Sequence, residues 1–366
     1  DVTIKVNLSE WDAITLQDFT FKVYMISPTA FKKNGGKWAS VNPIGTGPFK
    51  MVENKRNVHL KFEKFEDYWA EGEPFLDKLT ILLIKDPMTR MASLRRGDID
   101  AIMIPVQTSV QEAYKRGLGV DSNFGIAKVI QFNSKDPKSV WADKRMRMAL
   151  EYAIDKELNV ESFQRGMGRP VYSVIHSAPA DSGTVPRKYD PARAKALVAE
   201  AGHTGLKVKM LYQYDPGQQD SIVAYQSMLR EVGIEIIPTP VARAQWNQVL
   251  HKPISPNDLA YGTLHGSKAE VLSGADQNFG RGAVYFSSSK KPDGFQDLIE
   301  AALQQDSQEK ITEILRKAEK MAYDDVMIVP IQQIELHTIQ QTYVKGAIWT
   351  WSGRPAPLLS RTWLDK

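Results

Sequence analysis

The sequence predicts an α/β fold with two domains, and three observations support this prediction. The chain has 366 residues, 42% of them hydrophobic, which is enough for two domains that each bury a core. Strand-like and helix-like segments alternate from about residue 40 onward. Residues 208–237 show the order strand, helix, strand, which is typical of two parallel strands joined by a crossover helix.

The first third of the chain contains mostly short strands. Period-two alternation of apolar and polar residues predicts strands at residues 3–8, 49–52, 58–62 and 79–84. A helix over residues 87–96 follows, and Gly97 ends it because glycine adopts the left-handed conformation of a helix C-cap. A strand at 99–104, a helix at 110–116 and a strand at 126–132 come next.

The remaining two thirds contain the longer helices. From Asp143 onward, apolar residues fall on one helix face, and the other face carries Lys144, Arg145, Arg147 and Glu151, which predicts a charged face toward solvent. Asp190 and Pro191 begin a helix that ends at Gly202. The later predicted elements are strands at 208–212, 234–237, 259–263 and 327–331 and helices at 219–232, 293–303 and 308–323.

Composition excludes several function classes. The 47 basic and 43 acidic residues are spread along the chain, so the net charge of +4 does not indicate a nucleic-acid partner. The absence of cysteine excludes disulfides and thiolate nucleophiles. The six histidines lack the spacing of metal ligands, and no GxSxG motif is present. We therefore expect no metal, no cofactor and no enzymatic activity.

The N-terminal sequence has neither the pattern of a signal peptide nor that of a membrane span. It opens directly on the alternation of a strand, and no run of 18 uncharged apolar residues occurs anywhere. This start predicts that the chain is a fragment or a processed product.

A turn at residues 42–49 is the first of five stretches with a family pattern. Pro43 and Pro48 fix φ, while Gly45 and Gly47 permit positive φ or a close approach of the backbone. The five stretches are NPIGTGPF at 42–49, TRMASLRRGDID at 89–100, RMRMALEYAID at 145–155, YDPARAKALVAEAG at 189–202, and the closing helices with Val329 and Pro330. Through the order and spacing of these five stretches, the chain resembles the dipeptide, oligopeptide and nickel type of bacterial extracellular solute-binding protein, family 5.

The resemblance implies a periplasmic-binding-protein-like bilobal α/β fold of type II, similar to cluster C. Two hinge segments would cross between the lobes, near residues 126–133 and 329–340. Residues 1–125 plus 340–366 would form lobe one, and residues 126–339 would form lobe two. The family carries a further N-terminal part, so lobe one is expected to be incomplete, with an unpaired edge, and this chain alone is expected to bind ligand weakly or not at all.

The resemblance also implies a function. It is that of a non-enzymatic receptor of an ABC importer, in the periplasm or at the cell surface, monomeric when complete. Such a receptor traps a small solute, such as a peptide or an oligosaccharide, and delivers it to a permease in the membrane. A sensor on the same scaffold and an enzyme that uses the cleft between the lobes remain alternatives.

Candidate ligand-binding residues follow strands or flank the expected crossings. They are Tyr212, Gln213, Tyr214, Tyr261, His265, Asn133, Gln107, Trp349 and Trp351. Core packing is the alternative for the aromatic residues, and hinge structure for Gln107 and Asn133. Peptide binders of the family tend to carry an acidic motif after the strand at 259–263, where this chain reads YGTLHGSKAE. Glu270 or Asp276 could replace that motif, and His265 could hold a metal chelate.

Overall fold

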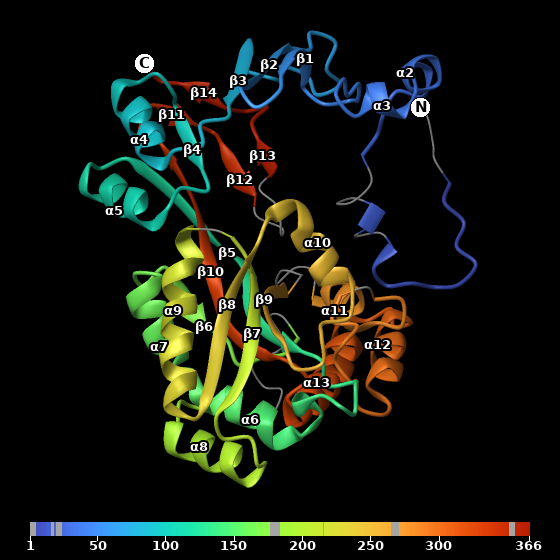
Figure 1. Cartoon of the computed structure of the whole chain (residues 1–366). Coiled ribbons are helices and arrows are strands. Elements are labelled where there is room, and N and C mark those ends of the chain that lie inside the picture. The colour runs from blue at the N-terminus through green and yellow to red at the C-terminus, as the bar shows by residue number, and fades with distance from the viewer. Residues whose placement is uncertain are drawn as a thin grey trace. The chain divides into compact units, whose positions relative to one another are not determined.

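The protein folds into two units, here called the large unit and the small unit (Figure 1). The structure is a computed structural model that describes residues 5–15, 18–19, 24–175, 184–214, 216–264, 271–283, 285–350 and 356–366. The large unit comprises the described parts of residues 1–16 and 124–335, and the small unit those of residues 17–123 and 336–366. Two long strands, β5 (Gly119–Phe132) and β10 (Val329–Gln340), each pass from one unit into the other.

A mixed sheet forms the centre of the large unit. Five strands lie in the order β8 (Ile234–Val241), β7 (Leu206–Gln213), β9 (Leu259–Leu264), β5 (Gly119–Phe132) and β10 (Val329–Gln340). β10 also pairs with β6 (Gly168–Pro170) and with β4 (Ala101–Met103) of the small unit, at different points along its length. β7 is parallel to β8 and to β9, which confirms the predicted crossover unit. β9 is antiparallel to β5, with Ala127 opposite Leu264. The carboxyl ends of β7, β8 and β9 therefore lie at the edge of the sheet where β5 enters the large unit.

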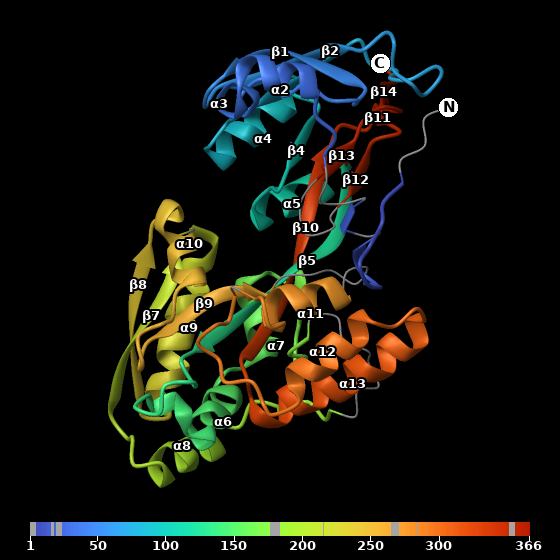
Figure 2. The ribbon, with the colours of Figure 1, turned by 90° about the vertical axis from the view of Figure 1, so that its right-hand side faces the viewer.

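Helices cover both faces of this sheet (Figure 2). One apolar core packs α6 (Lys144–Ala153), α8 (Pro191–Glu200) and α9 (Pro216–Glu231) on one face. A second core packs α11 (Val271–Phe279), α12 (Phe295–Leu303) and α13 (Gln308–Asp325) on the other. The remaining helices of this unit are α7 (Lys156–Leu158), α10 (Arg243–His251), the 3-10 helix η1 (Val140–Ala142) and the π-helix η2 (Asn159–Phe163).

The small unit contains an antiparallel sheet in the order β1, β2, β3. Its elements are α2 (Pro28–Asn34), α3 (Gly36–Ala39), β1 (Phe49–Lys55), β2 (His59–Lys64), β3 (Lys78–Leu82), α4 (Pro87–Arg96), β4 (Ala101–Met103), α5 (Gln107–Lys115), β11 (Val344–Lys345), β12 (Ile348–Thr350), β13 (Ala356–Leu358) and β14 (Trp363–Leu364). The strand predicted at residues 3–8 is not formed by residues 5–8, and the rest of that range lies outside the described residues.

Several local predictions are confirmed because short-range chemistry decides them. Asp86 caps α4 by accepting from the Thr89 amide at 2.7 Å, and Gly97 ends the helix with φ 78°. In the turn at 42–49, a Cβ on Gly45 would lie 2.9 Å from the Met25 carbonyl oxygen. That close approach explains why glycine is needed at this position.

The charged face predicted for α6 is wrong at two positions. Arg147 and Glu151 are 3% and 2% exposed, although the amphipathic pattern placed both toward solvent. Each is buried against a polar partner that the pattern does not contain: Asp325 for Arg147 and Lys156 for Glu151. Core packing thus extends around more of this helix than its apolar residues indicate.

A buried carboxylate on α13 holds the chain at residues 173–175. Glu319 accepts hydrogen bonds from the amides of Val174 at 2.9 Å and Ile175 at 2.6 Å. The Ser173 hydroxyl lies 3.1 Å from Glu319 Oε2 and also donates to the Ile175 carbonyl. Burial raises the pKa of Glu319 from 4.5 to about 7, and the two amides oppose that rise.

This raised pKa predicts a pH-dependent stability. Between pH 4.5 and 7 the folded state keeps the Glu319 proton that the unfolded state has lost, so the free energy of unfolding falls as pH rises, by up to about 3 kcal/mol. Urea unfolding at pH 5 and pH 7.5 measures this difference, and Glu319→Gln should remove most of it. The control is Glu313→Gln, which changes an exposed carboxylate of the same helix. An unaltered difference in Glu319→Gln would refute the assignment.

Candidate functional site

A group of side chains lies at the edge of the large unit where the parallel strands end. In open α/β sheets, ligands bind outside the carboxyl ends of the strands. We use the name edge cluster for the following six residues: Phe124, Lys128, Arg169, Tyr214, Gln218 and Gln333. They come from β5, β6, β10, α9 and the residue that follows β7. Contacts join Arg169 to Phe124 and Gln333, and Lys128 to Gln218.

Arg169 is the most constrained cation of the edge cluster. Its strand β6 pairs with β10 in a register that sets Arg169 opposite Gln333. Arg169 Nε donates to Gln333 Oε1 at 2.9 Å, and the guanidinium carbon lies 4.4 Å from the centroid of the Phe124 ring. Gln333 Nε2 in turn donates to the Gly125 carbonyl at 2.8 Å. The guanidinium plane is thus fixed from two sides on an exposed position.

Lys128 supplies a second positive charge on the same face of β5. Its Nζ lies 3.4 Å from Gln218 Oε1 and 5.7 Å from the centroid of the Tyr261 ring. Phe124 and Lys128 are four residues apart, so their side chains point to the same side of the strand. The edge cluster therefore combines two cations, an aromatic face and amide groups, which suits a polar or anionic small molecule.

A pocket of about 430 Å³ lies on the opposite face of the sheet. α10 covers it, and Leu211 of β7 and Val241 of β8 form part of its wall. Leu211 points away from the face that Tyr212 occupies, because adjacent residues of a strand alternate. The polar groups of its lining come from Gln245, Gln248, Lys252 and Ser255. This pocket is separate from the edge cluster, although both lie near the ends of β7 and β8.

Two tyrosines predicted to bind ligand lie in the apolar core. Tyr212 is 4% exposed and Tyr261 is 1% exposed, and the two are register partners on β7 and β9. Both point toward the core under α9, because the pleat directs alternate residues of each strand to that face. Burial raises the pKa of Tyr261 to about 12. Both residues therefore have a packing role, and ligand contact by either stays a prediction.

Tyr261 belongs to a buried hydrogen-bond network that also includes Tyr225. Tyr225 donates to Asn159 Oδ1 at 2.9 Å, and Asn159 Nδ2 donates to Gln332 Oε1 at 2.6 Å. Gln332 Nε2 lies 3.5 Å from the Tyr261 hydroxyl, and the rings of Tyr225 and Tyr261 pack edge to face at 5.5 Å. The network fixes the strands behind the edge cluster.

The other predicted residues are scattered. Tyr214 is 60% exposed at the end of β7, next to Gln213, which is half-buried. Asn133 is buried, and its amide donates to the Ile254 carbonyl at 2.7 Å. Gln107 begins α5 in the small unit, where Trp349 also lies with its indole donating to Gln340 Oε1 at 2.7 Å. His265, Glu270 and Trp351 lie outside the described residues, and Asp276 lies in α11.

Sequence reasoning missed Phe124, Arg169 and Lys128. A usable signal existed for Lys128, because it is the charged residue within the otherwise mostly apolar run at 126–132. Arg169 gave no such signal, since its contacts are with residues 45 and 164 positions away in the sequence.

In the described ranges, no three histidine, aspartate or glutamate side chains come together as metal ligands would. None of the described helices has both the length and the apolar character needed to cross a bilayer.

The fold and the family follow from comparison with known proteins. The fold is shared with solved ABC transporter substrate-binding proteins: the structure of CtaP from Listeria monocytogenes matches 98% of this chain and 75% of its own, with a TM-score of 0.82 and 21% identity. The chain belongs to the bacterial extracellular solute-binding proteins, family 5, whose middle region matches residues 1–254. The resemblance predicted from the five sequence stretches is confirmed.

Similar proteins in this family carry different ligand names. The oligopeptide-binding protein AppA of Bacillus subtilis is 30% identical over 235 residues, which are 59% of this chain and 42% of AppA. The heme-binding protein A of Haemophilus influenzae is 32% identical over 222 residues, which are 56% of this chain and 38% of that protein. The chain thus spans less than half of the length of these relatives.

Proposed function

We propose that the protein is a solute-binding receptor of an ABC importer, which binds a small solute outside the cytoplasm and delivers it to a membrane permease without converting it. The observation that carries this proposal is the family match over residues 1–254. The edge cluster supports the proposal, because its side chains offer positive charge and an aromatic face to a solute. No catalytic motif links the elements that carry these side chains. The periplasm or the cell surface would be the site of action.

We further propose that the two units are the two lobes of this receptor, with boundaries near residues 125 and 340. The backbone contacts, which divide the chain at 123/124 and 335/336, support this assignment, although residues 1–16 group with the large unit and not with lobe one. The strands β5 and β10 would be the two hinge segments. Ligand contacts made by both lobes would then favour a closed state over an open one.

Ligand binding without turnover is the expected result of a direct test. The sequence led us to expect weak or no binding by this chain alone, but the chain contains both of the units that would form the lobes. We therefore propose that isothermal titration of the chain with short peptides, heme, a nickel–histidine chelate and neutral oligosaccharides should identify at least one ligand. A ligand at 100 times its Kd should raise the free energy of unfolding by about 2.7 kcal/mol. Mass spectrometry of the mixture after incubation should recover the ligand unchanged. Chemical conversion of the ligand, or no binding by any compound, would contradict the proposal.

A further inference from the structure

We infer that a second pocket of the large unit binds a small aromatic molecule through an oxyanion group, a carboxylate or a phosphate, and that this ligand is not the transported solute. The pocket, here called the tyrosine pocket, has a volume of about 590 Å³. It is lined by the loop of residues 184–190, by Tyr152 of α6, and by Tyr323 and Asp324 of α13. None of these residues belongs to the edge cluster, so the inference goes beyond the proposed function and does not rest on it.

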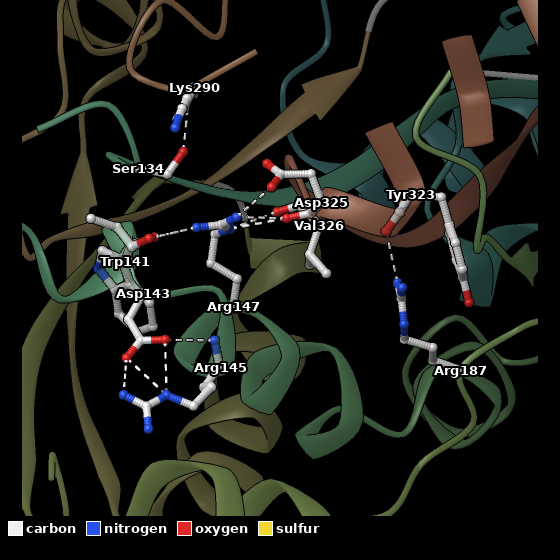
Figure 3. A network of polar contacts seen from close by, with 11 residues as sticks. Ser134, Trp141, Asp143, Arg145, Arg147, Arg187, Lys290, Tyr323, Asp325 and Val326 are labelled. Atoms are coloured by element: carbon white, nitrogen blue, oxygen red, sulfur yellow. Dashed lines mark hydrogen bonds and ion pairs between the residues drawn. The ribbon is translucent and has the colours of Figure 1, made fainter. Parts of the chain in front are cut away.

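Hydrogen bonds hold the loop of the tyrosine pocket in place. The Tyr323 hydroxyl donates to the Val185 carbonyl, and Arg187 Nη1 donates to the Tyr323 carbonyl at 3.0 Å (Figure 3). At the other end of the loop, the Asp190 amide donates to the Tyr152 carbonyl at 2.9 Å. The loop is thus joined to both α6 and α13. Because the pocket is already formed, a ligand does not have to order the loop when it binds.

Two arginines stack on tyrosine rings that line this pocket. The guanidinium carbon of Arg187 lies 3.8 Å from the centroid of the Tyr323 ring, and that of Arg193 lies 4.8 Å from the centroid of the Tyr152 ring. Lys188 of the loop is a third cation, and it is exposed. A stacked guanidinium keeps N–H groups at the edge of its plane, where an oxyanion can accept from them. The tyrosine pocket thus has the donors that an oxyanion requires.

The carboxylates next to these cations have other partners. Asp190 Oδ1 accepts from the Arg193 amide at 2.9 Å as the N-cap of α8, and Asp324 Oδ2 lies 2.7 Å from Lys320 Nζ. Within the part of the chain that the structure describes, Arg187 donates to one backbone carbonyl and forms no ion pair. No carboxylate of the protein therefore neutralises this guanidinium directly, and an oxyanion in the pocket would do so.

The charges around the pocket indicate how the ligand is oriented. Asp155 and Glu231 lie on the side of Tyr189, since burial and the charges of Glu231 and Asp155 raise the pKa of this tyrosine. The oxyanion should therefore lie toward Arg187, away from these two carboxylates. The aromatic ring of the ligand would lie toward Tyr189, which is 36% exposed, and toward Pro186, because both side chains offer apolar surface to the pocket.

Matched anionic and neutral probes test this inference. Isothermal titration of the protein would compare benzoate with benzamide, and phenyl phosphate with dimethyl phenyl phosphate. We expect at least one of the two anions to bind roughly 10- to 100-fold more tightly than its neutral partner. Acetate and inorganic phosphate, which lack the ring, should bind more weakly than the aromatic anions. The tighter of the two aromatic anions identifies the oxyanion as a carboxylate or a phosphate.

Two substitutions in the loop should reduce the preference for the anion. Arg187→Gln should lower it by about tenfold or more, because the charge-assisted hydrogen bonds are lost. This variant also loses the bond to the Tyr323 carbonyl, so Lys188→Met is a second test that does not depend on the stability of the loop. The Lys188 side chain is exposed and makes no hydrogen bond or ion pair with the described residues, so its urea unfolding should stay unchanged while the preference falls by a smaller factor.

Lys195→Met and Lys128→Met are the matched controls. Lys195 is an exposed lysine of α8 outside the pocket, and Lys128 is a cation of the edge cluster. Both variants should keep the full preference for the anion. No binding by any probe, equal affinity for anion and neutral partner, or an unchanged preference in both Arg187→Gln and Lys188→Met would overturn the inference. Loss of the preference in Lys128→Met would overturn it too, because the probes would then occupy the edge cluster. The proposed function would stand in each case, since other ligands test it.

Discussion

Replacing Arg147 with methionine should lower the free energy of unfolding by about 3–5 kcal/mol. The guanidinium is 3% exposed and joins two segments far apart in the sequence (Figure 3). Nη1 donates to the carbonyls of Trp141 and Ala142 at 3.0 Å, and Nη2 donates to the Asp325 carbonyl at 2.7 Å and to Asp325 Oδ1 at 3.0 Å. Nε is 3.2 Å from the carbonyls of Asp325 and Val326.

The expected loss comes from the partners that methionine leaves behind. The carbonyls belong to η1 and to the end of α13, where few other donors reach them. Methionine fills a similar volume but donates no hydrogen bond, so buried carbonyls and the Asp325 carboxylate would remain unpaired. Burial lowers the pKa of Arg147 and the neighbouring Asp325 opposes this effect, so the side chain stays charged at neutral pH.

Arg145→Met is the matched control for this prediction. Arg145 lies two residues away on the same helix, and its ion pair with Asp143 is partly exposed. Such pairs contribute at most about 1 kcal/mol, so this variant should unfold at nearly the urea concentration of the original protein. Urea unfolding followed by tryptophan fluorescence measures both variants. Equal losses in the two would show that Arg147 does not join the segments as described.

Arg147 also shows which part of the fold the sequence could not predict. The helix α6 itself was predictable, because its apolar residues recur with the helical period and Asp143 caps it. The burial of the Arg147 side chain was not predictable, because its partner Asp325 is 178 positions away in the sequence. A pattern based on hydrophobicity assigns a charged residue to solvent unless its partner is known.

The full length of strand β10 also could not be predicted from the sequence. Its apolar start at 327–331 was predicted, but the strand runs on to Gln340. Gln332 and Gln333 interrupt the apolar pattern and are nevertheless buried, because Asn159 and Gly125 satisfy their side chains. Hydrogen bonds between distant segments thus allow polar residues inside the sheet.

For the candidate site, the sequence predicted where the strands end, but it did not predict which side chains come together there. The strands β7 and β9 are parallel, with Tyr212 opposite Tyr261, so their carboxyl ends lie at the same edge of the sheet. Tyr212 is 4% exposed and Tyr214 is 60% exposed, although both were predicted to contact ligand. Residues two apart share a side of a strand, so the difference comes from the end of β7: Tyr212 lies within the strand and Tyr214 follows its last residue, Gln213. Arg169 and Phe124 meet only through the pairing of β6 with β10, a contact between segments that no local pattern connects.

Breaking the buried ion pair of Glu151 and Lys156 should destabilise the large unit by about 3–5 kcal/mol for either single substitution. The two side chains are 2% and 1% exposed, with Lys156 Nζ 2.5 Å from Glu151 Oε1. Lys156 Nζ also donates to the Val171 carbonyl at 3.3 Å and lies 4.5 Å from the Tyr172 centroid. Glu151 Oε2, by contrast, has no hydrogen-bond partner among the described residues.

The double variant separates the pair's own contribution from the cost of an orphaned charge. Lys156→Met alone leaves a buried carboxylate without its cation, and Glu151→Leu alone leaves a buried ammonium group, whose pKa burial already lowers. Together the two substitutions leave no buried charge, so the double variant should lie within about 2 kcal/mol of the original protein. The double variant should therefore lose several kcal/mol less stability than the sum of the losses of the two single variants, and this difference is the coupling energy of the double-mutant cycle.

The control pair for this cycle is Lys317 and Glu313 on the exposed side of α13, 2.8 Å apart. The corresponding cycle there should give a coupling energy of about 0.5 kcal/mol or less, because water screens both charges. Additive losses in the double variant would mean that the two side chains are solvated separately, and the buried pair would have to be abandoned.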